Sequence, residues 1–277
     1  MLVFNKQAVR NSIFIALFCF LTCSVSNAND RNNTHDKTKY SLLDTVQGDL
    51  ENYYSIDNLK FMTISFGLGG ILANTSVDED LQEEYQDNIR SDSTDDFSEV
   101  AKMFGEGKIL IPLSIATAVT GYYLPKKCGV SAIGTWGFNT ARSYFVGAPP
   151  MLLMQNVTGA SRPGEKKDAS NWRPFEDTNG VSGHAFMGAV PFITLAKMYK
   201  FSHVKWLFYG GSLLAGWSRV NDDDHFLSQA ALGWAMAYQS VNSVFLTDEE
   251  QQENNALTFN VYPNGRNGFE FLMSYCW

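Results

Sequence analysis

The sequence predicts an all-α protein, a helical bundle that ends in a short C-terminal β-hairpin. Uncharged runs of helical length recur along the chain and contain or border proline and glycine. Three long runs after the first 28 residues are Ile109–Pro125, Ser143–Ser161 and Phe226–Thr247. Mean hydropathy is slightly negative, whereas a polytopic membrane protein is clearly apolar overall. We therefore expect these runs to be buried helices of a soluble or peripheral protein, with a membrane-embedded helix set as the alternative.

The first 28 residues have the pattern of a secretory signal peptide. Lys6 and Arg10 supply a basic start, and Ser12–Cys23 is apolar but short for a membrane span. Small residues up to Ala28 suit a cleavage site. We expect export across the inner membrane to a periplasmic or envelope location, with a retained N-terminal anchor as the alternative.

The remainder is long enough for one large domain. We expect a disordered polar linker over 29–40, a single helical domain over 41–256 and the hairpin over 257–277. Removal of residues 1–28 takes away two cations and no acids, so the net charge changes from −8 to −10. Such an acidic surface argues against a nucleic-acid partner.

Two cysteines remain after the signal peptide, Cys128 and Cys276. An oxidising compartment permits a disulfide bridge between them. The sequence does not show whether the two Cα atoms approach each other closely enough, so both states stay open.

The N-terminal half predicts a succession of helices before the chemistry-bearing residues. Residues 41–60 form a short amphipathic opening, Phe61–Ala73 is apolar and glycine-rich, and Ser76–Lys102 is acidic and helix-favouring. Its acids, among them Asp78 and Asp95, suit helix N-termini, and we expect most of them to face solvent.

Buried helices are expected next. Gly107–Leu124 carries proline only in its first turns, and Ser131–Thr158 is expected to be interrupted at Pro149-Pro150. A polar loop then covers 160–181.

Three helices follow that loop, over Gly183–Tyr199, Val204–Trp217 and His225–Leu246. The tryptophans of this part, at positions 206, 217 and 234, are expected in the core. Apolar side chains alternate on both sides of Pro263–Gly268, which predicts the hairpin.

Two short strings carry the functional signal, Ser182-Gly183-His184 and Ser218-Arg219-x5-His225. They hold two of the four histidines of the chain. Ser182 and Gly183 precede a predicted helix, whose N-terminus offers free N–H groups to an anion such as phosphate. Arginine binds phosphate oxygens in bidentate fashion. A histidine beside that anion can attack phosphorus or donate a proton.

These strings resemble the type 2 phosphatidic acid phosphatase (PAP2) superfamily, which includes bacterial acid phosphatases and vanadium haloperoxidases. The family pattern is Lys-x6-Arg-Pro, then Pro-Ser-Gly-His, then Ser-Arg-x5-His-x3-Asp. Here the second motif is Val181–His184 and the third is Ser218–Gln229. The resemblance covers about residues 100–245. It implies a helical bundle of the PAP2/haloperoxidase type.

The first family motif fits two places in the sequence. Literal matching gives Lys166-x6-Arg173-Pro174, wholly within the polar loop. A second register gives Gln155-x6-Arg162-Pro163, at the end of an apolar helix, with glutamine where the family has lysine. We favour Arg162 as the structural match, with Lys166 or Arg173 folding back to add charge.

The resemblance also implies a role for each residue. His225 attacks phosphorus and becomes a phosphohistidine, and His184 protonates the leaving alcohol. The phosphoryl oxygens are held by cations and donors: Arg219, Ser182, Gly183, Arg162, Lys166 and Arg173. No metal or other cofactor is implied, although vanadate or phosphate can occupy such a pocket.

Gln229 stands where the family has the aspartate that orients the nucleophilic histidine. A glutamine carbonyl can accept the Nδ1 proton but supplies no negative charge. The acids Asp222–Asp224 lie just before His225 and are expected in a solvated turn, with a cation site as the alternative.

The leading hypothesis is a secreted or periplasmic phosphomonoesterase. A lipid phosphate or polyprenyl diphosphate phosphatase at the membrane, peripherally associated, is the second. A haloperoxidase using bound vanadate is a third, and an inactive envelope protein that keeps the fold is a fourth, to which Gln155 and Gln229 both point.

Overall fold

The computed structural model describes residues 40–123, 128–166, 168–199, 202–263 and 269–275. The predicted signal peptide, the linker up to residue 39 and Cys276 lie outside the described residues. The expectations for these segments, and for a bridge to Cys276, therefore stay predictions.

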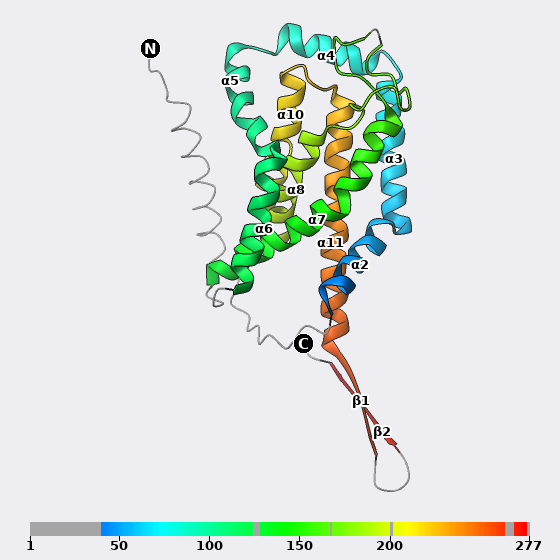
Figure 1. Cartoon of the computed structure of the whole chain (residues 1–277), viewed down its shortest axis with the longest axis vertical. Coiled ribbons are helices and arrows are strands. Elements are labelled where there is room, and N and C mark those ends of the chain that lie inside the picture. Colours follow the sequence, from blue (N-terminus) through cyan, green and yellow to red (C-terminus); the bar gives the residue numbers. More distant parts are fainter. Residues whose placement is uncertain (1–39, 124–127, 167, 200–201, 264–268, 276–277) are drawn as a thin grey trace.

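The described chain is a helical bundle, so the predicted all-α class is confirmed (Figure 1). The long helix α11 runs along the middle of the bundle. The elements are α2 (Leu42–Tyr53), α3 (Ile56–Ala73), α4 (Val77–Asn88), α5 (Asp92–Ala101), the 3₁₀ turn η1 (Lys102–Gly105), α6 (Gly107–Tyr123), α7 (Cys128–Thr158), α8 (Gly183–Met198), α9 (Ser202–Gly211), α10 (Leu214–Asn221), α11 (Leu227–Ala256), β1 (Leu257–Pro263) and β2 (Phe269–Tyr275).

Serine residues begin several of these helices. Ser41, Ser55, Ser91 and Ser182 are N-caps whose hydroxyl oxygens accept a hydrogen bond from a backbone N–H in the first turn. Each cap satisfies one of the donors that a helix start leaves free and contributes about 1 kcal/mol. The start of α8, on which the candidate site depends, is thus encoded locally.

The core is built around α8, which packs against α7, α9, α10, α11 and η1. Its residues from Ala185 to Ala196 are buried, apart from Met187. Phe186 and Ile193 pack there with Leu232 and Met236 of α11. Because α8 is surrounded by other helices, its first turn has a fixed position at one end of the bundle.

Helix α7 runs without a break from Cys128 to Thr158, through Pro149 and Pro150. The expected interruption is therefore wrong. Proline removes one hydrogen bond and crowds the preceding turn, but α7 packs on α6, α8 and α11 along its length. Tertiary packing holds the helix where local propensity would end it.

Some helices expected in the interior lie at the surface. Helix α6 buries only Leu110 and Ser114 fully, and Ile111, Ile115 and Val119 are each at least 41% exposed. Trp206, expected in the core, is 70% exposed. Uncharged composition alone did not distinguish a buried helix from one that forms an apolar outer surface.

The two helices before the third motif also differ from expectation. The segment expected as one helix over Val204–Trp217 is broken at Ser212, and α10 continues to Asn221. The last helix starts at Leu227, not at His225. His225 therefore lies in the connection between α10 and α11, on irregular backbone that can aim its side chain into the site.

A buried ion cluster ties α2, α7 and α11 together. Arg142 Nε donates to Asp49 Oδ2 at 2.8 Å, and Arg142 Nη1 donates to Asp248 Oδ1 at 2.6 Å. Arg142 and Asp49 are 4% and 0% exposed. Removing one partner would leave an unpaired buried charge, which costs about 3–5 kcal/mol.

The tail after α11 is extended. β1 and β2 pair antiparallel, with Leu257 opposite Tyr275 and Pro263 opposite Phe269. The predicted turn over 264–268 lies outside the described residues.

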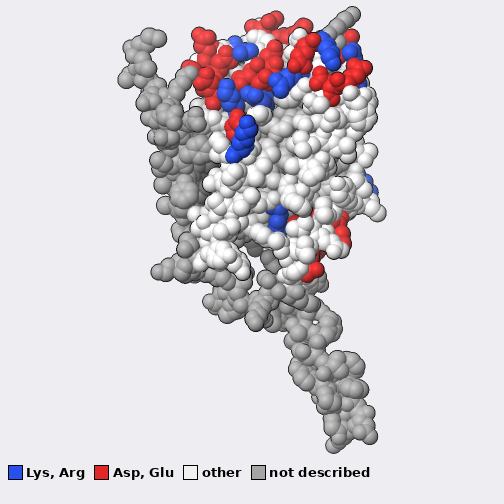
Figure 2. Space-filling model, in the orientation of Figure 1, with Lys and Arg blue, Asp and Glu red and all other residues white. Residues whose placement is uncertain are grey.

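Charged side chains gather at one end of the molecule, around α4, and the face below them in Figure 2 is almost uncharged. Exposed apolar side chains cover α3, α6 and α7 below that end: Ile64, Leu68, Ile71, Ile111, Ile115, Val119, Phe138 and Phe145. We call these eight residues the apolar belt.

Among the helices of the described ranges, none by itself is long and apolar enough to cross a membrane. The segments Asp92–Gly105 and Gly107–Tyr123, which meet at an angle of 48°, pass that test together as a bent pair.

Candidate active site

The first turn of α8 forms one side of the candidate site. Ser182 is its N-cap, and its hydroxyl accepts the Ala185 N–H at 3.3 Å. The Ser182 N–H donates to the Gln229 carbonyl at 2.9 Å, which fixes α8 against α11. Gly183 and half-buried His184 follow in the first turn. The sequence prediction of this helix start is confirmed.

His225 lies two residues before α11 and is 6% exposed. Its Nδ1 is 2.7 Å from Gln229 Oε1, which also accepts the Phe226 N–H at 3.3 Å. Gln229 Nε2 donates to the Ser161 carbonyl at 2.8 Å. Because the amide is oriented by these two neighbours, its oxygen must accept from the imidazole. His225 therefore carries its proton on Nδ1, and Nε2 has the free lone pair.

Arg219 is held at the C-terminal end of α10 by two carboxylates. Its Nη2 donates to Asp222 Oδ2 and its Nη1 pairs with Asp224 Oδ2, both at 2.7 Å. Asp222 also accepts from Ser98 of α5 at 2.6 Å. The expected solvated turn is thus wrong for Asp222 and Asp224, because both bind the arginine of the third motif.

Arg162 reaches the same group of charges from the loop after α7. Its Nη1 is 3.5 Å from Asp224 Oδ1, and its Nε donates to Asn179 Oδ1 at 3.2 Å. Gln155, seven residues earlier, lies beside Gly183 and donates to the Val181 carbonyl at 2.8 Å. The second register of the first motif is therefore the one that the fold brings to the histidine motifs.

The cations of the literal register pair with acids of the loop that carries them. Lys166 pairs with Asp177 at 3.5 Å, and Arg173 pairs with Glu176 at 4.0 Å. Both acids belong to the same loop as the cations, so the loop offsets part of its own charge. Of the three candidates for this side of the site, Arg162 is the one that forms an ion pair with Asp224 in the described part of the chain.

Sequence reasoning missed Glu106, which faces His184. Its Oε1 is 3.7 Å from His184 Nε2. The approach depends on Gly105, where a Cβ would lie 2.9 Å from the His184 carbonyl oxygen. Glu106 belongs to no motif and lies far from His184 in sequence, so only a conserved pairing across sequences could have revealed it.

A second missed residue, Asp78 of α4, supports the start of α11. It is 0% exposed and accepts the Ser228 N–H at 3.0 Å and the Ser228 hydroxyl. Burial raises the pKa of this carboxyl, against the two hydrogen bonds from Ser228. The expectation that the acids of this stretch face solvent is wrong here. These two hydrogen bonds fix the backbone three residues after His225.

The electrostatics of the two histidines show that they border one group of charges. Burial lowers the pKa of His225 to about 4, with Gln229 opposing and Arg162 and Arg219 adding to the shift. Burial and Arg219 lower the pKa of His184, while Glu106 and Asp224 raise it. Both imidazoles are therefore neutral near pH 7 and sensitive to Arg219 and Asp224.

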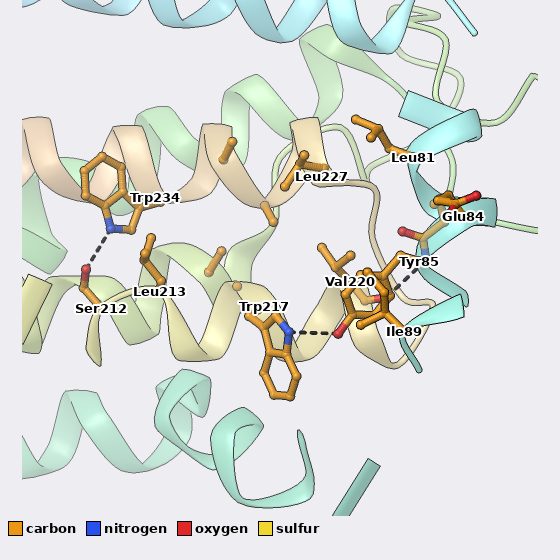
Figure 3. A pocket seen from close by; sticks show the side chains of 15 residues that line it. Leu81, Glu84, Tyr85, Ile89, Ser212, Leu213, Trp217, Val220, Leu227 and Trp234 are labelled. Atoms are coloured by element: carbon orange, nitrogen blue, oxygen red, sulfur yellow. Dashed lines mark hydrogen bonds between the residues drawn. The ribbon is translucent and has the colours of Figure 1, made fainter. Parts of the chain in front are cut away.

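An apolar groove borders the same backbone segments (Figure 3). It has a volume of about 470 Å³ and lies between α4, α10 and α11. Trp217, Leu213, Leu227 and Trp234 line it, and the Trp217 N–H is satisfied by the Tyr85 hydroxyl at 2.9 Å. Two of its other lining residues directly follow His184 and Arg219 in sequence, namely Ala185 and Val220.

In the part of the chain that the structure describes, no group of three or more His, Cys, Asp or Glu side chains is arranged to hold a metal ion. The PAP2 superfamily model matches residues 133–252. The match extends from α7 to α11 and includes Arg162, His184, Arg219 and His225. No curated protein and no solved structure matches the chain.

Proposed function

We propose that the chain hydrolyses phosphate esters through a phosphohistidine at His225, because its residues 133–252 match the model of the PAP2 superfamily, whose members are in general phosphatases. The observation that supports this most directly is the convergence of Arg162, Arg219, His184 and His225 on Asp224 and its surroundings. A phosphoryl group between the two arginines would lie beside both imidazoles.

In the first step, the lone pair on His225 Nε2 attacks phosphorus and forms a P–N bond. The bond from phosphorus to the ester oxygen breaks, and His184 in its protonated form gives its proton to the leaving alcohol. In the second step, neutral His184 takes a proton from water as that water attacks phosphorus. The P–N bond breaks, phosphate leaves, and both histidines return to their starting states.

The surrounding groups would stabilise the charge that develops on phosphoryl oxygens. Arg219, 11% exposed, can give two N–H donors, and Arg162 can approach from the loop. The backbone N–H groups at the start of α8 add the positive end of a helix dipole. These fixed donors act most strongly where water is excluded.

The test is to trap the intermediate. Brief incubation of the full chain with a ³²P-labelled phosphate monoester, followed by an alkaline quench that preserves phosphohistidine, should leave label on His225. His225→Ala should lose the label and at least about a thousandfold in kcat. His203→Ala, an exposed histidine on α9, is the matched control and should keep both.

Normal turnover by His225→Ala would end the phosphohistidine mechanism. If the wild-type chain hydrolyses no member of a broad panel of phosphate esters, the inactive envelope protein becomes the better interpretation.

A lipid-borne phosphate is a second candidate substrate, and the apolar belt favours it. The charged end of the molecule carries the candidate site, and the uncharged surface lies directly below it (Figure 2). Exposed apolar patches of this extent mark interaction surfaces in proteins. An association of this surface with lipid would place the site at the level of the phosphate groups.

The test of this candidate compares two substrates that share the glycerol phosphate group, one with long acyl chains and one without them. A long-chain diacylglycerol phosphate in mixed micelles should give a kcat/KM at least about tenfold above that of glycerol phosphate, which corresponds to about 1.4 kcal/mol of transition-state binding. Equal values would favour a phosphomonoesterase of soluble esters.

We also propose that the chain is exported, on the strength of the signal-like pattern in its first 28 residues. Cell fractionation should find it in the periplasm or envelope, and N-terminal sequencing should show cleavage near Ala28. A full-length cytoplasmic product would overturn this proposal.

A further inference from the structure

A carboxylate of the chain itself lies between the two arginines of the candidate site. Asp224 Oδ2 is 2.7 Å from Arg219 Nη1, and Asp224 Oδ1 is 3.5 Å from Arg162 Nη1. Its two oxygens thus bridge two guanidinium groups, which is how a phosphate would bind there. Asp224 directly precedes His225 in the chain, and its charge raises the pKa values of both His184 and His225.

The backbone before this residue holds an unusual conformation. Asp223 has φ of 61°, in the left-handed region that few residues other than glycine, asparagine and aspartate adopt. Asp224 N–H and His225 N–H both donate to the Arg219 carbonyl, at 2.9 and 3.1 Å. This tight turn directs the Asp224 side chain back toward the arginine.

The arginine is not fully satisfied by these contacts. Arg219 Nε is buried and has no hydrogen-bond partner in the described part of the chain. The side chain as a whole is 11% exposed. An unpaired buried donor is costly. The Asp224 carboxylate therefore does not use every N–H donor of Arg219. A phosphate has one or two more oxygens than a carboxylate and can accept more hydrogen bonds.

From these observations we propose that Asp224 is an internal competitor that occupies the phosphate position in the empty site and must be displaced by the substrate. This inference rests on the proposed phosphatase function. Asp224 turns away when a phosphoryl group binds, and Arg162 and Arg219 exchange its carboxylate for phosphoryl oxygens. The side chain is 34% exposed, so it has space to move toward solvent.

An internal competitor lowers the affinity of every phosphate by the same factor, because only the fraction of molecules with an open site can bind. Free phosphate has no other contacts to offset this loss. An ester with a large organic part gains further binding energy from that part. Asp224 would therefore leave the ratio of kcat/KM between two esters unchanged, but it would keep inorganic phosphate weakly bound and let it leave readily, while an ester with an extended organic group still binds.

The test measures the binding of inorganic phosphate and of vanadate to the full-length chain by calorimetry. Asp224→Asn removes the charge but keeps the shape, and it should lower both Kd values about tenfold. It should also raise kcat/KM for glycerol phosphate and for a long-chain ester by about the same factor, because the closed fraction reduces the binding of both equally.

Asp223→Asn is the matched control. It removes the same charge one residue earlier, and asparagine tolerates the left-handed backbone at least as well as aspartate. Gln82 Nε2 donates a hydrogen bond to Asp223 Oδ1 at 2.7 Å. The amide oxygen of asparagine can accept the same bond. The Kd for phosphate should therefore stay within twofold of wild type.

Asp224→Asn with an unchanged or higher Kd would overturn the proposal, because it would show that the carboxylate only positions the arginines. An equal gain in Asp223→Asn would also overturn it in favour of a general charge effect. If Asp224→Asn binds phosphate more tightly but no variant hydrolyses an ester, this inference stands and the proposed function fails.

Discussion

At the residue scale, the two histidines of the candidate site have opposite requirements. His225 must be neutral to attack phosphorus, and its pKa is lowered to about 4 by burial. His184 must be protonated to assist the leaving group, and burial and Arg219 lower its pKa below the usual 6.5. Both conditions hold together only in an acidic range of pH.

We predict a bell-shaped profile of kcat/KM against pH. The acidic limb should lie near pH 4, where His225 becomes protonated as the pH falls. The basic limb should lie below pH 6.5, where His184 loses its proton as the pH rises. Measuring initial rates at low substrate concentration between pH 3 and 9 checks this. A maximum above pH 7.5 would contradict the assignment of the two roles.

Substitution of Glu106 should shift the basic limb of the pH profile and leave the acidic limb unchanged. Its carboxylate raises the pKa of His184, so Glu106→Gln should shift the basic limb to lower pH and leave the acidic limb in place. Glu83→Gln, an exposed acid on α4, is the control and should shift neither limb. A loss of rate at every pH, without a shift, would indicate that Glu106 only supports the fold.

At the element scale, the site depends on how closely α8 and α11 approach. A Cβ on Gly233 would lie 2.3 Å from the Ser182 carbonyl oxygen, and one on Gly188 would lie 2.4 Å from the Ala215 side chain. Two glycines thus permit α8 to contact α11 and α10 at the level of the motifs. The close contacts bring the N-cap serine and Gln229 within hydrogen-bonding distance.

We predict that Gly233→Ala will separate these helices. The methyl group has no space beside the Ser182 backbone, so the substitution should destabilise the fold by about 1–3 kcal/mol and lower kcat at least tenfold. Gly210→Ala on α9 is the control, since nothing lies within 4 Å of a Cβ there; it should be neutral or stabilising by up to about 1 kcal/mol.

Urea unfolding and initial rates at one substrate concentration measure both effects. If Gly233→Ala matches Gly210→Ala in stability and rate, the helices can adjust without disturbing the site.

At the scale of the whole molecule, charge is segregated from apolar surface. The acids and bases of α4, α5 and the loops that carry Arg162 and Asp224 form one end, and the apolar belt covers the helices beneath (Figures 1 and 2). Arg142, a charge below that end, is buried in ion pairs with Asp49 and Asp248. The lateral surface is thus apolar although the net charge is −8.

If the apolar belt contacts lipid, a charge within it should weaken that contact. Ile115→Glu, on the exposed face of α6, should reduce co-sedimentation with vesicles of neutral phospholipid at least about fivefold. Val77→Glu is the control, because this exposed residue lies at the charged end and an acid suits the first turn of α4. Equal sedimentation of both variants would show that the belt does not face lipid.

The sequence allowed much of the site to be predicted, because helix starts and motif chemistry are local properties. Ser182, Gly183 and His184 begin a helix as expected, and His225 bonds to Gln229 four residues later. The choice between Arg162 and Arg173 could not be made from spacing alone. It depends on which loop side chain the fold brings to Asp224, and the two candidates have similar local sequences.

By itself, the sequence determined the helical class, the two histidine motifs and the unusual Gln229, since each rests on residue identity and short spacing. Only the tertiary structure decided that α7 passes through two prolines, that α6 lies at the surface, and that Glu106 and Asp78 serve the site. It also placed Asp224 between two arginines. These features join residues far apart in sequence, where packing and burial outweigh local preference.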